Sequence, residues 1–338
     1  MISYFLKRVL QAIPTFLLVS VFAFGVIRLL PGDPVLLMLG ERGGSPELVA
    51  EMRAQLGLDQ PLPVQYFKFL KGSLQGNFGE SIVSNRPVTE EFFGRFPATA
   101  ELGVLALLFA VLVGIPLGIV AAMMRGKIWD RVLMGVSLFG YSMPIFWWGL
   151  LMILLFSVHL GWTPVSGRIS PMYDVEPWSG FLLIDVWVRD LGGEGFFNAL
   201  KYLILPSFVL GTVPMAAIAR MTRSSLLEVL KEDYVRTAQA KGLGPFQVVV
   251  RHALSNAMIP IVTVAGLMLG TILTGAVLTE SIFSWPGIGK WLVSSVIARD
   301  YPVIQGGILL ISGFVISINI LVDTLYLYLN PKMREAQQ

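Results

Sequence analysis

Four ionisable residues stand inside or at the ends of long apolar stretches, where a charge is costly and usually faces protein or water. They are Arg28, Glu101, Glu280 and Asp323. Such charges could line a path for a zwitterionic solute, or they could pair with other groups. Arg28, Glu101 and Glu280 lie near the ends of their stretches, which favours snorkelling or pairing there over ligand contact. Asp323 lies deeper, which favours a partner within the helix bundle or on another subunit.

The residue types that carry most enzyme chemistry are scarce in this sequence. The 338 residues include no cysteine, so disulfides, thiolate catalysis and cysteine-ligated metals are excluded. The two histidines, His159 and His252, are predicted to lie on opposite sides of a membrane and cannot share a metal ion. There is no His-Glu-x-x-His motif, no Gly-x-Ser-x-Gly elbow and no phosphate-binding Gly-x-x-x-x-Gly-Lys-Ser/Thr loop. We therefore expect no catalytic residue, metal or cofactor on this chain, and an intramembrane hydrolase would lack its catalytic pair.

The distribution of charge indicates that the chain spans a membrane. Hydrophobic residues make up 55% of it and charged residues 14%, whereas soluble domains are roughly 25% charged. A helix needs about 20 mostly apolar residues to cross the hydrocarbon core. Six stretches of 18 residues or more contain no Asp, Glu, Lys or Arg: 9–27, 102–124, 132–167, 202–219, 252–279 and 301–322. The sequence therefore predicts an all-α polytopic membrane protein with six transmembrane helices, the first of them an uncleaved anchor.

Basic residues are concentrated in the segments that lie inside if the N-terminus is cytoplasmic. These inside segments carry 13 Lys or Arg and 5 Asp or Glu, whereas the longer outside segments carry 11 and 14. This bias follows the positive-inside rule and predicts that both termini are cytoplasmic. The basic residues flank the spans and form no continuous stripe, so we expect membrane lipid around the chain and no nucleic-acid partner.

The predicted spans divide the chain into segments. Residues 1–30 form the N-terminus and first helix, and residues 31–98 form an external helical cap. Within the cap, Ser45-Pro46-Glu47 is typical of a helix start, and a second short helix is expected over 64–70; a solvated loop with fraying helices is the alternative. The other segments are spans at about 101–124, 133–158, 201–219, 259–280 and 304–329, an irregular external loop at 159–200 with a short surface helix near 181–188, and a cytoplasmic tail at 331–338.

Small and aromatic residues predict how the spans are built. Glycines stand four residues apart at 114–118 and at 266–270, a spacing that lets helix backbones approach closely in lipid. Five prolines are each expected to kink or start a span: Pro116, Pro144, Pro206, Pro214 and Pro260. Trp162 and Trp285 are typical of anchors at the membrane interface.

The internal segment 220–258 is the most informative part of the chain. Apolar residues recur in it at spacings of three and four, which predicts an amphipathic helix from about Ser224 to Lys241 that Gly242 ends. Such a helix could lie in the lipid interface, pack on its own bundle or dock into a groove of a partner. Interfacial helices usually carry Trp or Phe opposite a basic face. Here the apolar face is small and aliphatic and the charges are mixed, so docking into a partner is favoured.

Residues 236–242 and 251–254 resemble the cytoplasmic loop signature of permease subunits of binding-protein-dependent ABC importers. That signature reads Glu-Ala-Ala, three residues, Gly, nine residues, Ile, one residue, Leu-Pro. Ala238, Gly242 and Leu254 match it. Four positions depart from it in a way that resembles the peptide-transporting branch: Arg236, Thr237, His252 and Ser255.

The resemblance extends over nearly the whole chain, to the first of the two permease subunits of dipeptide importers. It is carried also by residues 31–34, 140–148, 163–168, 220–224, 279–287 and 299–302. It implies a type I ABC importer transmembrane domain over about 95–330, in the bacterial inner membrane. It also implies dipeptide import by alternating access. Oligopeptide, nickel and haem permeases of the same family are alternatives, and a stand-alone ion-coupled carrier is an alternative of another class.

The resemblance also implies the partners of the chain. A second homologous permease, two ABC ATPase subunits and a periplasmic peptide-binding protein would complete the assembly, with ATP and Mg bound by the ATPases. Because this chain has no phosphate-binding loop, its energy must come from such a partner, and segment 220–258 is the expected contact. The residues predicted to make it are Tyr234, Arg236, Ala238, Lys241, Gly242 and Leu243. Gly242 could be needed because the helix end turns closely against the partner, or it could be only a helix stop.

Overall fold

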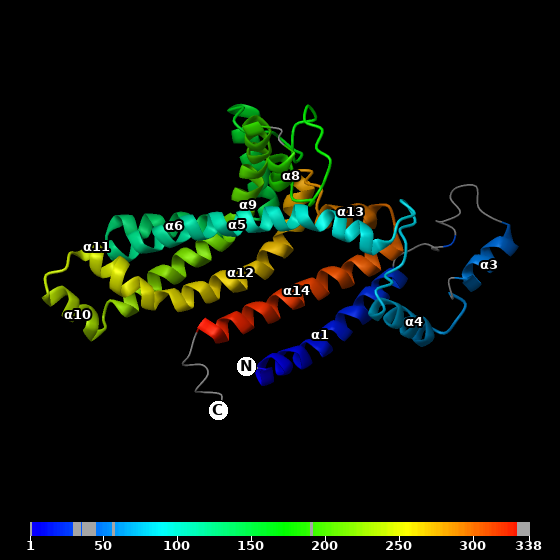
Figure 1. Cartoon of the computed structure of the whole chain (residues 1–338), viewed down its shortest axis with the longest axis horizontal. Coiled ribbons are helices and arrows are strands. Elements are labelled where there is room, and N and C mark those ends of the chain that lie inside the picture. The colour runs from blue at the N-terminus through cyan, green and yellow to red at the C-terminus, as the bar shows by residue number, and fades with distance from the viewer. Residues whose placement is uncertain (1, 30–34, 36–44, 56–57, 190–191, 330–338) are drawn as a thin grey trace. The chain divides into compact units, whose positions relative to one another are not determined.

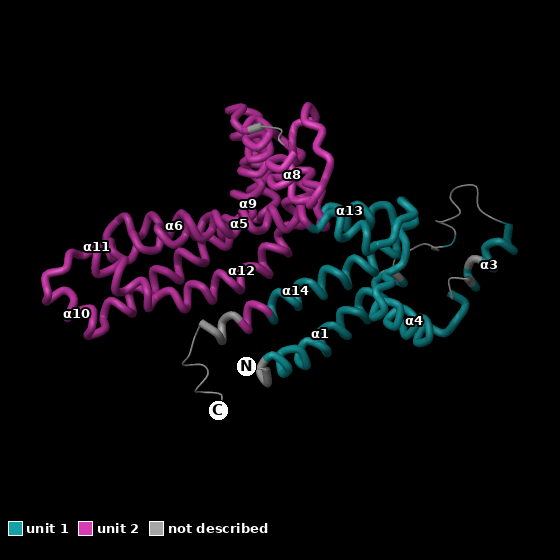
Figure 2. Tube along the Cα trace, in the orientation of Figure 1, with its two compact units in different colours: residues 1–96, 290–320 teal, residues 97–289, 321–338 magenta. Residues whose placement is uncertain are grey.

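The computed structural model describes residues 2–29, 35, 45–55, 58–189 and 192–329, and most of them are helical. The chain forms two compact units, shown in different colours in Figure 2. Unit 1 consists of residues 1–96 and 290–320, and unit 2 of residues 97–289 and 321–338. Residues 31–34, which carry part of the resemblance, and the predicted tail at 331–338 lie outside the described residues.

Within the described residues, five helices are long and apolar enough to cross a membrane, or six if one bent pair counts as a single span. This agrees with the six spans that the charge-free stretches predict. Figure 1 labels the five: α1 (Ile2–Leu29), α5 (Val88–Met123), α9 (Gly192–Val229), α12 (Leu254–Ile282) and α14 (Tyr301–Leu329).

The third predicted span, 133–158, is not one straight helix. Helix α6 (Ile128–Ser142) is followed by α7 (Ile145–Met152) and a π-helical segment, η1 (Ile153–His159), and the two parts meet at 107°. Met143 between them is extended, with φ −77° and ψ 132°, because a residue that precedes proline is disfavoured in the helical conformation. The sequence correctly placed a break at Pro144 but did not predict the size of the bend. The other four prolines singled out from the sequence lie inside α5, α9 and α12 and do not end these helices.

Several helices extend beyond the predicted spans. Helix α5 begins at Val88 rather than near residue 101, and α9 begins at Gly192 rather than near residue 201. A charge-free stretch marks only the part of a helix that lies in hydrocarbon, whereas acidic residues such as Glu90 and Glu91 are favourable in a first turn. The external loop is therefore shorter than predicted: it contains α8 (Leu182–Val188), near the predicted short helix, and gives way to α9.

In unit 1, two short helices follow α1 close to the predicted positions: α3 (Pro46–Gln55) and α4 (Leu62–Leu74). Helix α4 packs on α1 through Tyr66, whose ring meets the ring of Phe24 edge-on at 5.4 Å between centroids. The Tyr66 hydroxyl also shares a 2.7 Å hydrogen bond with Ser20 Oγ.

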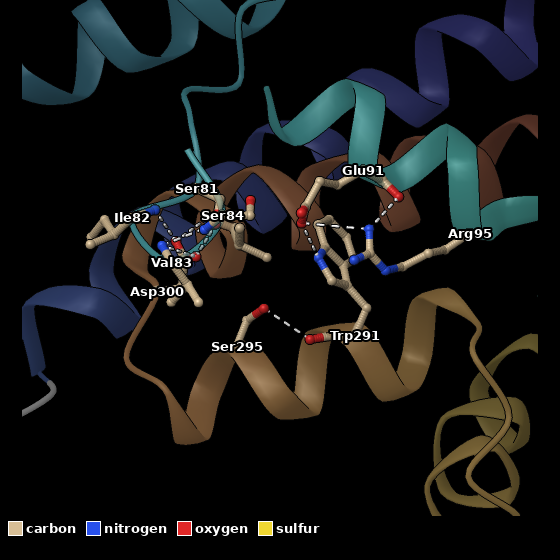
Figure 3. A network of polar contacts seen from close by, with 10 residues as sticks. Ser81, Ile82, Val83, Ser84, Glu91, Arg95, Trp291, Ser295 and Asp300 are labelled. Carbon is tan, nitrogen blue, oxygen red and sulfur yellow. Dashed lines mark hydrogen bonds and ion pairs between the residues drawn. The ribbon is translucent and has the colours of Figure 1, made fainter. Parts of the chain in front are cut away.

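Unit 1 also contains α13 (Ile288–Ile297), a short apolar helix that the sequence did not predict. Figure 3 shows how buried polar groups join it and the start of α14 to the segment before and within α5. Asp300 accepts hydrogen bonds from Ser81 Oγ at 2.5 Å and from the backbone of Ile82 at 3.2 Å. Glu91 accepts one from Trp291 Nε1 at 2.6 Å. These contacts hold the loop before α5 against α13 and α14.

In unit 2, α9 packs against α5, α6 and α12. The glycines at 114–118 let α5 and α9 approach closely, as predicted. A Cβ atom on Gly118 would lie 2.5 Å from Thr222 Cβ and 2.6 Å from the carbonyl oxygen of Ala219. A Cβ atom on Gly266 of α12 would lie 2.6 Å from Val322 Cγ1 of α14, so one glycine of the second pair also marks a close contact.

We expect Gly118→Val to lower the melting temperature, because the added side chain meets backbone as well as side-chain atoms of α9 and overpacking of this kind costs about 1–3 kcal/mol. The measurement is thermal unfolding of the purified protein in detergent, followed by tryptophan fluorescence. Gly135→Val is the control, since a Cβ atom on Gly135 of α6 would meet nothing within 4 Å. Equal losses in the two variants would contradict the importance of this contact.

Candidate functional site

The predicted coupling segment, 220–258, is built from shorter helices than the sequence suggested. The single helix expected from Ser224 to Lys241 is wrong, because α9 ends at Val229 and α10 (Asp233–Ala240) begins after a turn. Glu232 before α10 is extended, with φ −68° and ψ 147°. Asp233 then provides an acidic residue in the first turn, where it interacts favourably with the helix dipole. A turn therefore separates two helices where apolar spacing alone predicted one.

Helix α10 rests on its own chain through a small apolar face. Val235 and Ala238 are buried against Val248, with Leu230 and Leu243 around them. Val248 begins the π-helical segment η2 (Val248–Ala253), which leads directly into α12. Ala238 and Leu243 therefore hold α10 against the bundle within this chain.

The hydroxyl of Tyr234 adds a polar link between α10 and α12. It accepts a 2.7 Å hydrogen bond from Asn256 Nδ2. Sequence reasoning missed this contact, because the two residues belong to different helices. Tyr234 is still 42% exposed, so it can bind Asn256 and also face another molecule.

The side of segment 220–258 that faces away from Val248 is exposed. Arg236, Lys241 and Gly242 lie there. Phe246 of α11 (Pro245–Gln247) is 66% exposed and was not singled out from the sequence. An aromatic residue in a polar internal turn is the signal that could have found it. The exposed side thus offers two cations, a glycine turn and two aromatic rings.

Gly242 ends α10 as predicted and has a left-handed backbone, with φ +83°. Its N–H donates to the carbonyl oxygen of Gln239 at 2.9 Å. A Cβ atom on Gly242 would meet nothing within 4 Å. Within this chain, glycine is therefore required by the backbone conformation and not by crowding.

Glu101 of α5 is an ion-pair partner of the external loop. It is buried, and its carboxylate accepts hydrogen bonds from Arg168 Nη2 at 2.7 Å and from the backbone N–H of Leu183 at 2.8 Å. The carboxylate thereby fastens both the irregular loop and α8 to α5. Both oxygens have donors in the chain, which makes Glu101 a structural anchor of the loop.

A second buried carboxylate, Asp185 of α8, binds the loop residues that precede this helix. It accepts hydrogen bonds from Ser179 Oγ at 2.6 Å, from Ser179 N at 2.7 Å and from Gly180 N at 3.0 Å. Burial raises the pKa of Asp185, but the hydrogen bonds from Ser179, Gly180 and Trp178 together outweigh burial, so the pKa lies below its ordinary value.

Asp185→Asn is expected to lower the melting temperature at neutral pH by more than it does in acid. A carboxylate whose pKa is lowered by folding contributes its stability above the unfolded pKa of about 3.9 and loses it as the pH falls through the folded pKa. The difference in melting temperature between the parent and the variant should therefore shrink below about pH 4. Asp174→Asn, at an exposed position of the same loop, is the control. A difference that stays constant from neutral pH into acid would contradict this role.

Glu280, the third predicted buried charge, is fully enclosed at the end of α12. It is 0% exposed and accepts hydrogen bonds from Thr99 Oγ1 at 2.5 Å and from Gly289 N at 2.7 Å. A Cβ atom on Gly287 would collide with the carboxylate and with Thr99 Oγ1. The group therefore joins α5, α12 and the turn between α12 and α13.

Trp285 lies in the same turn, and its predicted role as an interface anchor is wrong. The side chain is fully buried, and its Nε1 donates to the carbonyl oxygen of Ala98 at 2.8 Å. Ser284 before it has a left-handed backbone, with φ +51°, and the turn directs the indole toward α5. Trp162, by contrast, is exposed.

The other two predicted charges have different surroundings. Arg28 Nη2 donates to Gln65 Oε1 at 2.5 Å, and the guanidinium lies 3.3 Å from the ring centroid of Phe24. Asp323 is partly buried on α14. The donors to Glu101 are Arg168 and the N–H of Leu183, whereas Glu280 accepts hydrogen bonds from Thr99 and Gly289, so the two carboxylates stabilise different junctions. Within the described ranges, no group of three or more His, Asp and Glu side chains is placed to hold a metal ion.

Unit 2 also contains an apolar cavity of about 270 Å³ between α7, α9 and α12. Sequence reasoning could not find it, because its walls come from three helices that are distant along the chain. The lining residues are Ile145, Leu210, Val213, Pro214, Thr271, Thr274, Gly275 and Leu278.

Comparison with known proteins shows the family to which the chain is similar. Residues 114–335 match the family described as the inner membrane component of binding-protein-dependent transport systems, and residues 1–103 match the N-terminal family of such membrane components. The di/tripeptide transport system permease protein DppB of Pseudomonas aeruginosa is 56% identical over 337 residues, and the dipeptide transport system permease protein DppB of Escherichia coli is 52% identical over 342. Both alignments cover the whole of each chain.

A solved structure, of the MetNI methionine ABC transporter in inward-facing conformations, has a similar fold. The TM-score is 0.52 at 18% sequence identity, over 69% of this chain and 93% of that one. The fold is thus that of a type I ABC importer transmembrane domain, and the relatives are permease components rather than enzymes. With its apolar spans and its full-length match to such permeases, the chain belongs to the family of inner-membrane components of binding-protein-dependent transport systems.

Proposed function

We propose that this chain is the permease subunit of an ATP-driven dipeptide importer and forms half of the translocation pathway. The observation that carries the proposal is identity above 50% over the full length with permeases named for dipeptides and for di- and tripeptides. The excess of basic residues in the inside segments supports cytoplasmic N- and C-termini.

The complete transporter would contain a second homologous permease, two ABC ATPase subunits and a periplasmic peptide-binding protein. The sequence has no phosphate-binding loop. This supports the proposal that ATP and Mg bind to the ATPases and that this chain carries no cofactor. The exposed side of segment 220–258 is the proposed contact with an ATPase. The contact residues are Tyr234, Arg236, Lys241, Gly242 and Phe246. Ala238 and Leu243 pack on the apolar cluster around Val248 and hold α10 in place.

The geometry of α10 supports a mechanical form of coupling. Val235 and Ala238 attach α10 to η2, which continues into α12, and Tyr234 is bonded directly to Asn256 of α12. Displacement of α10 by closure of the ATPase pair would therefore move a membrane span. Movement of packed helices of this kind can convert an inward-open pathway into an outward-open one.

The test is uptake of a labelled dipeptide into vesicles that contain the complete complex. We expect uptake to require ATP and the binding protein, and to be inhibited by unlabelled dipeptides more strongly than by longer peptides, nickel or haem. Uptake by this chain alone, driven by an ion gradient, would overturn the proposal in favour of a stand-alone carrier. Stronger inhibition by one of the other solutes would assign the complex to that substrate instead.

A further inference from the structure

An ion pair that sequence reasoning did not identify joins the start of α6 to α9. Arg223 Nε donates to Asp130 Oδ1 at 2.6 Å, and Arg223 Nη2 donates to Asp130 Oδ2 at 2.8 Å. The backbone N–H of Gly126 donates to the same carboxylate at 3.0 Å. Asp130 is only 4% exposed. Two parallel bonds fix the relative orientation of the groups as well as their distance.

One residue of the pair, Arg223, belongs to segment 220–258 itself. Arg223 is within the last two turns of α9, which ends at Val229 and is followed after a short turn by α10. Figure 1 shows the start of α6 and helices α10 and α11 at the same end of unit 2. A displacement of α10 therefore reaches Arg223 before it reaches the rest of α9.

From Asp130, helix α6 leads toward the cavity. The helix has 15 residues and is therefore about 22 Å long. It ends at the 107° bend before α7, and Ile145, the first residue of α7, lines the cavity between α7, α9 and α12. Near the bend, the Arg220 guanidinium of α9 lies 4.8 Å from the ring centroid of Tyr141 of α6.

The close packing of α6 on α9 does not itself need the ion pair. A Cβ atom on Gly140 would lie 2.6 Å from Thr212 Cγ2, so the helices are in tight contact well away from Asp130. Apolar surfaces of this kind hold helices together but permit sliding, whereas a bidentate pair resists it. The pair is only partly buried, because the Arg223 side chain is 29% exposed, and what it adds to the apolar packing is a fixed orientation of α6 on α9.

We propose that the Asp130–Arg223 ion pair, called the joint below, transmits movement of α10 to α6. Movement of α6 would then shift the bend before α7 and the cavity that Ile145 lines. This inference rests on the proposed function, because it assigns positioning residues to ATP-driven transport. It predicts that breaking the joint separates ATP hydrolysis from uptake without preventing assembly.

The experiment uses the complete complex in vesicles with Asp130→Asn or Arg223→Lys in this chain. Uptake, ATP hydrolysis and the amount of assembled complex are measured together. We expect assembled complex with uptake per ATP reduced at least fivefold, since typical coupling free energies correspond to factors of about 5 to 150. Arg131→Gln, an exposed charge one residue from Asp130, is the matched control and should leave the ratio unchanged. An unchanged ratio in both joint variants, or uptake and hydrolysis that fall together with the amount of complex, would overturn the inference.

A second measurement replaces the joint by a covalent link. The chain has no cysteine, so Asp130→Cys with Arg223→Cys provides the only thiols on it for a short, reducible cross-linker. Uptake per ATP should rise on cross-linking and fall again after reduction, and a ratio that does not respond to the link would contradict the joint. The unaltered complex separates the two claims: if it shows no ATP-dependent uptake the proposed function fails, whereas if it transports normally and only the variants behave unexpectedly, the joint alone fails.

Discussion

Gly242→Val is expected to abolish dipeptide uptake and the ATP hydrolysis that the loaded binding protein stimulates. Gly242 has φ +83° at the end of α10, and a β-branched residue held in that conformation costs about 1–3 kcal/mol. The substituted turn would relax toward negative φ, which redirects the chain between α10 and α11. Arg236 and Lys241 on one side of the turn and Phe246 on the other would then no longer share one surface. The measurement is uptake and ATP hydrolysis by the assembled complex.

Gly244→Val is the matched control for this variant. Gly244 lies in the same turn and is equally uncrowded, but its backbone has φ −63° and ψ 153°, which valine adopts readily. We expect it to retain uptake. Full uptake by Gly242→Val would contradict the proposed site.

Gly242→Asn separates the two explanations for the glycine. Asparagine tolerates the left-handed conformation better than other side chains. Retained uptake in this variant would show that Gly242 serves as a helix stop. Lost uptake, with the complex assembled, would show that the ATPase subunit approaches this turn too closely for any side chain.

Glu280→Ala is expected to cause the largest loss of stability among single changes at the predicted charges. The substitution leaves the N–H of Gly289 and the hydroxyl of Thr99 without their acceptor in a place that water does not reach. Each buried unsatisfied group costs about 1–3 kcal/mol, and the lost volume adds to this. The measurement is the melting temperature in detergent, followed by the fluorescence of buried tryptophans such as Trp285.

Two further variants sharpen this test. Glu280→Gln should have a melting temperature between those of the parent and Glu280→Ala, because one oxygen acceptor remains while the amide nitrogen faces a donor. Glu194→Gln, at an exposed position near the start of α9, should leave the melting temperature unchanged. If Glu280→Ala kept its stability and lost only uptake, Glu280 would belong to the solute pathway and not to the structural junction.

Much of the fold was predictable because its determinants are local. The number and order of the spans follow from the length of the apolar stretches, since hydrocarbon excludes charge wherever a helix crosses it. The end of α10 at Gly242 and the break at Pro144 follow from the backbone preferences of single residues. Segment 220–258 could be proposed as a coupling site because its polarity, length and helical spacing distinguish it from the apolar spans.

The predicted helix from Ser224 to Lys241 shows the limit of such local patterns. Apolar residues at spacings of three and four occur both in one helix and in two helices separated by a turn. The interruption after Val229 depends on how Val235 and Ala238 reach Val248, a contact that spacing alone cannot reveal. The same limit applies to the ends of α5 and α9, which continue beyond the stretches that hydrocarbon requires to be free of charge.

The sequence by itself therefore determined that this protein crosses the membrane repeatedly, and it predicted that the energy for transport comes from another chain through a helix followed by a glycine turn. Only the tertiary structure decided what the charged and polar side chains do. Thr99 meets Glu280 across 181 positions, and Asp130 meets Arg223 across 93. A charge in an apolar environment must find a partner, but the chain can supply that partner from any helix that packs nearby. Which charges lie on a pathway, which fasten a loop and which join two helices is therefore decided by packing.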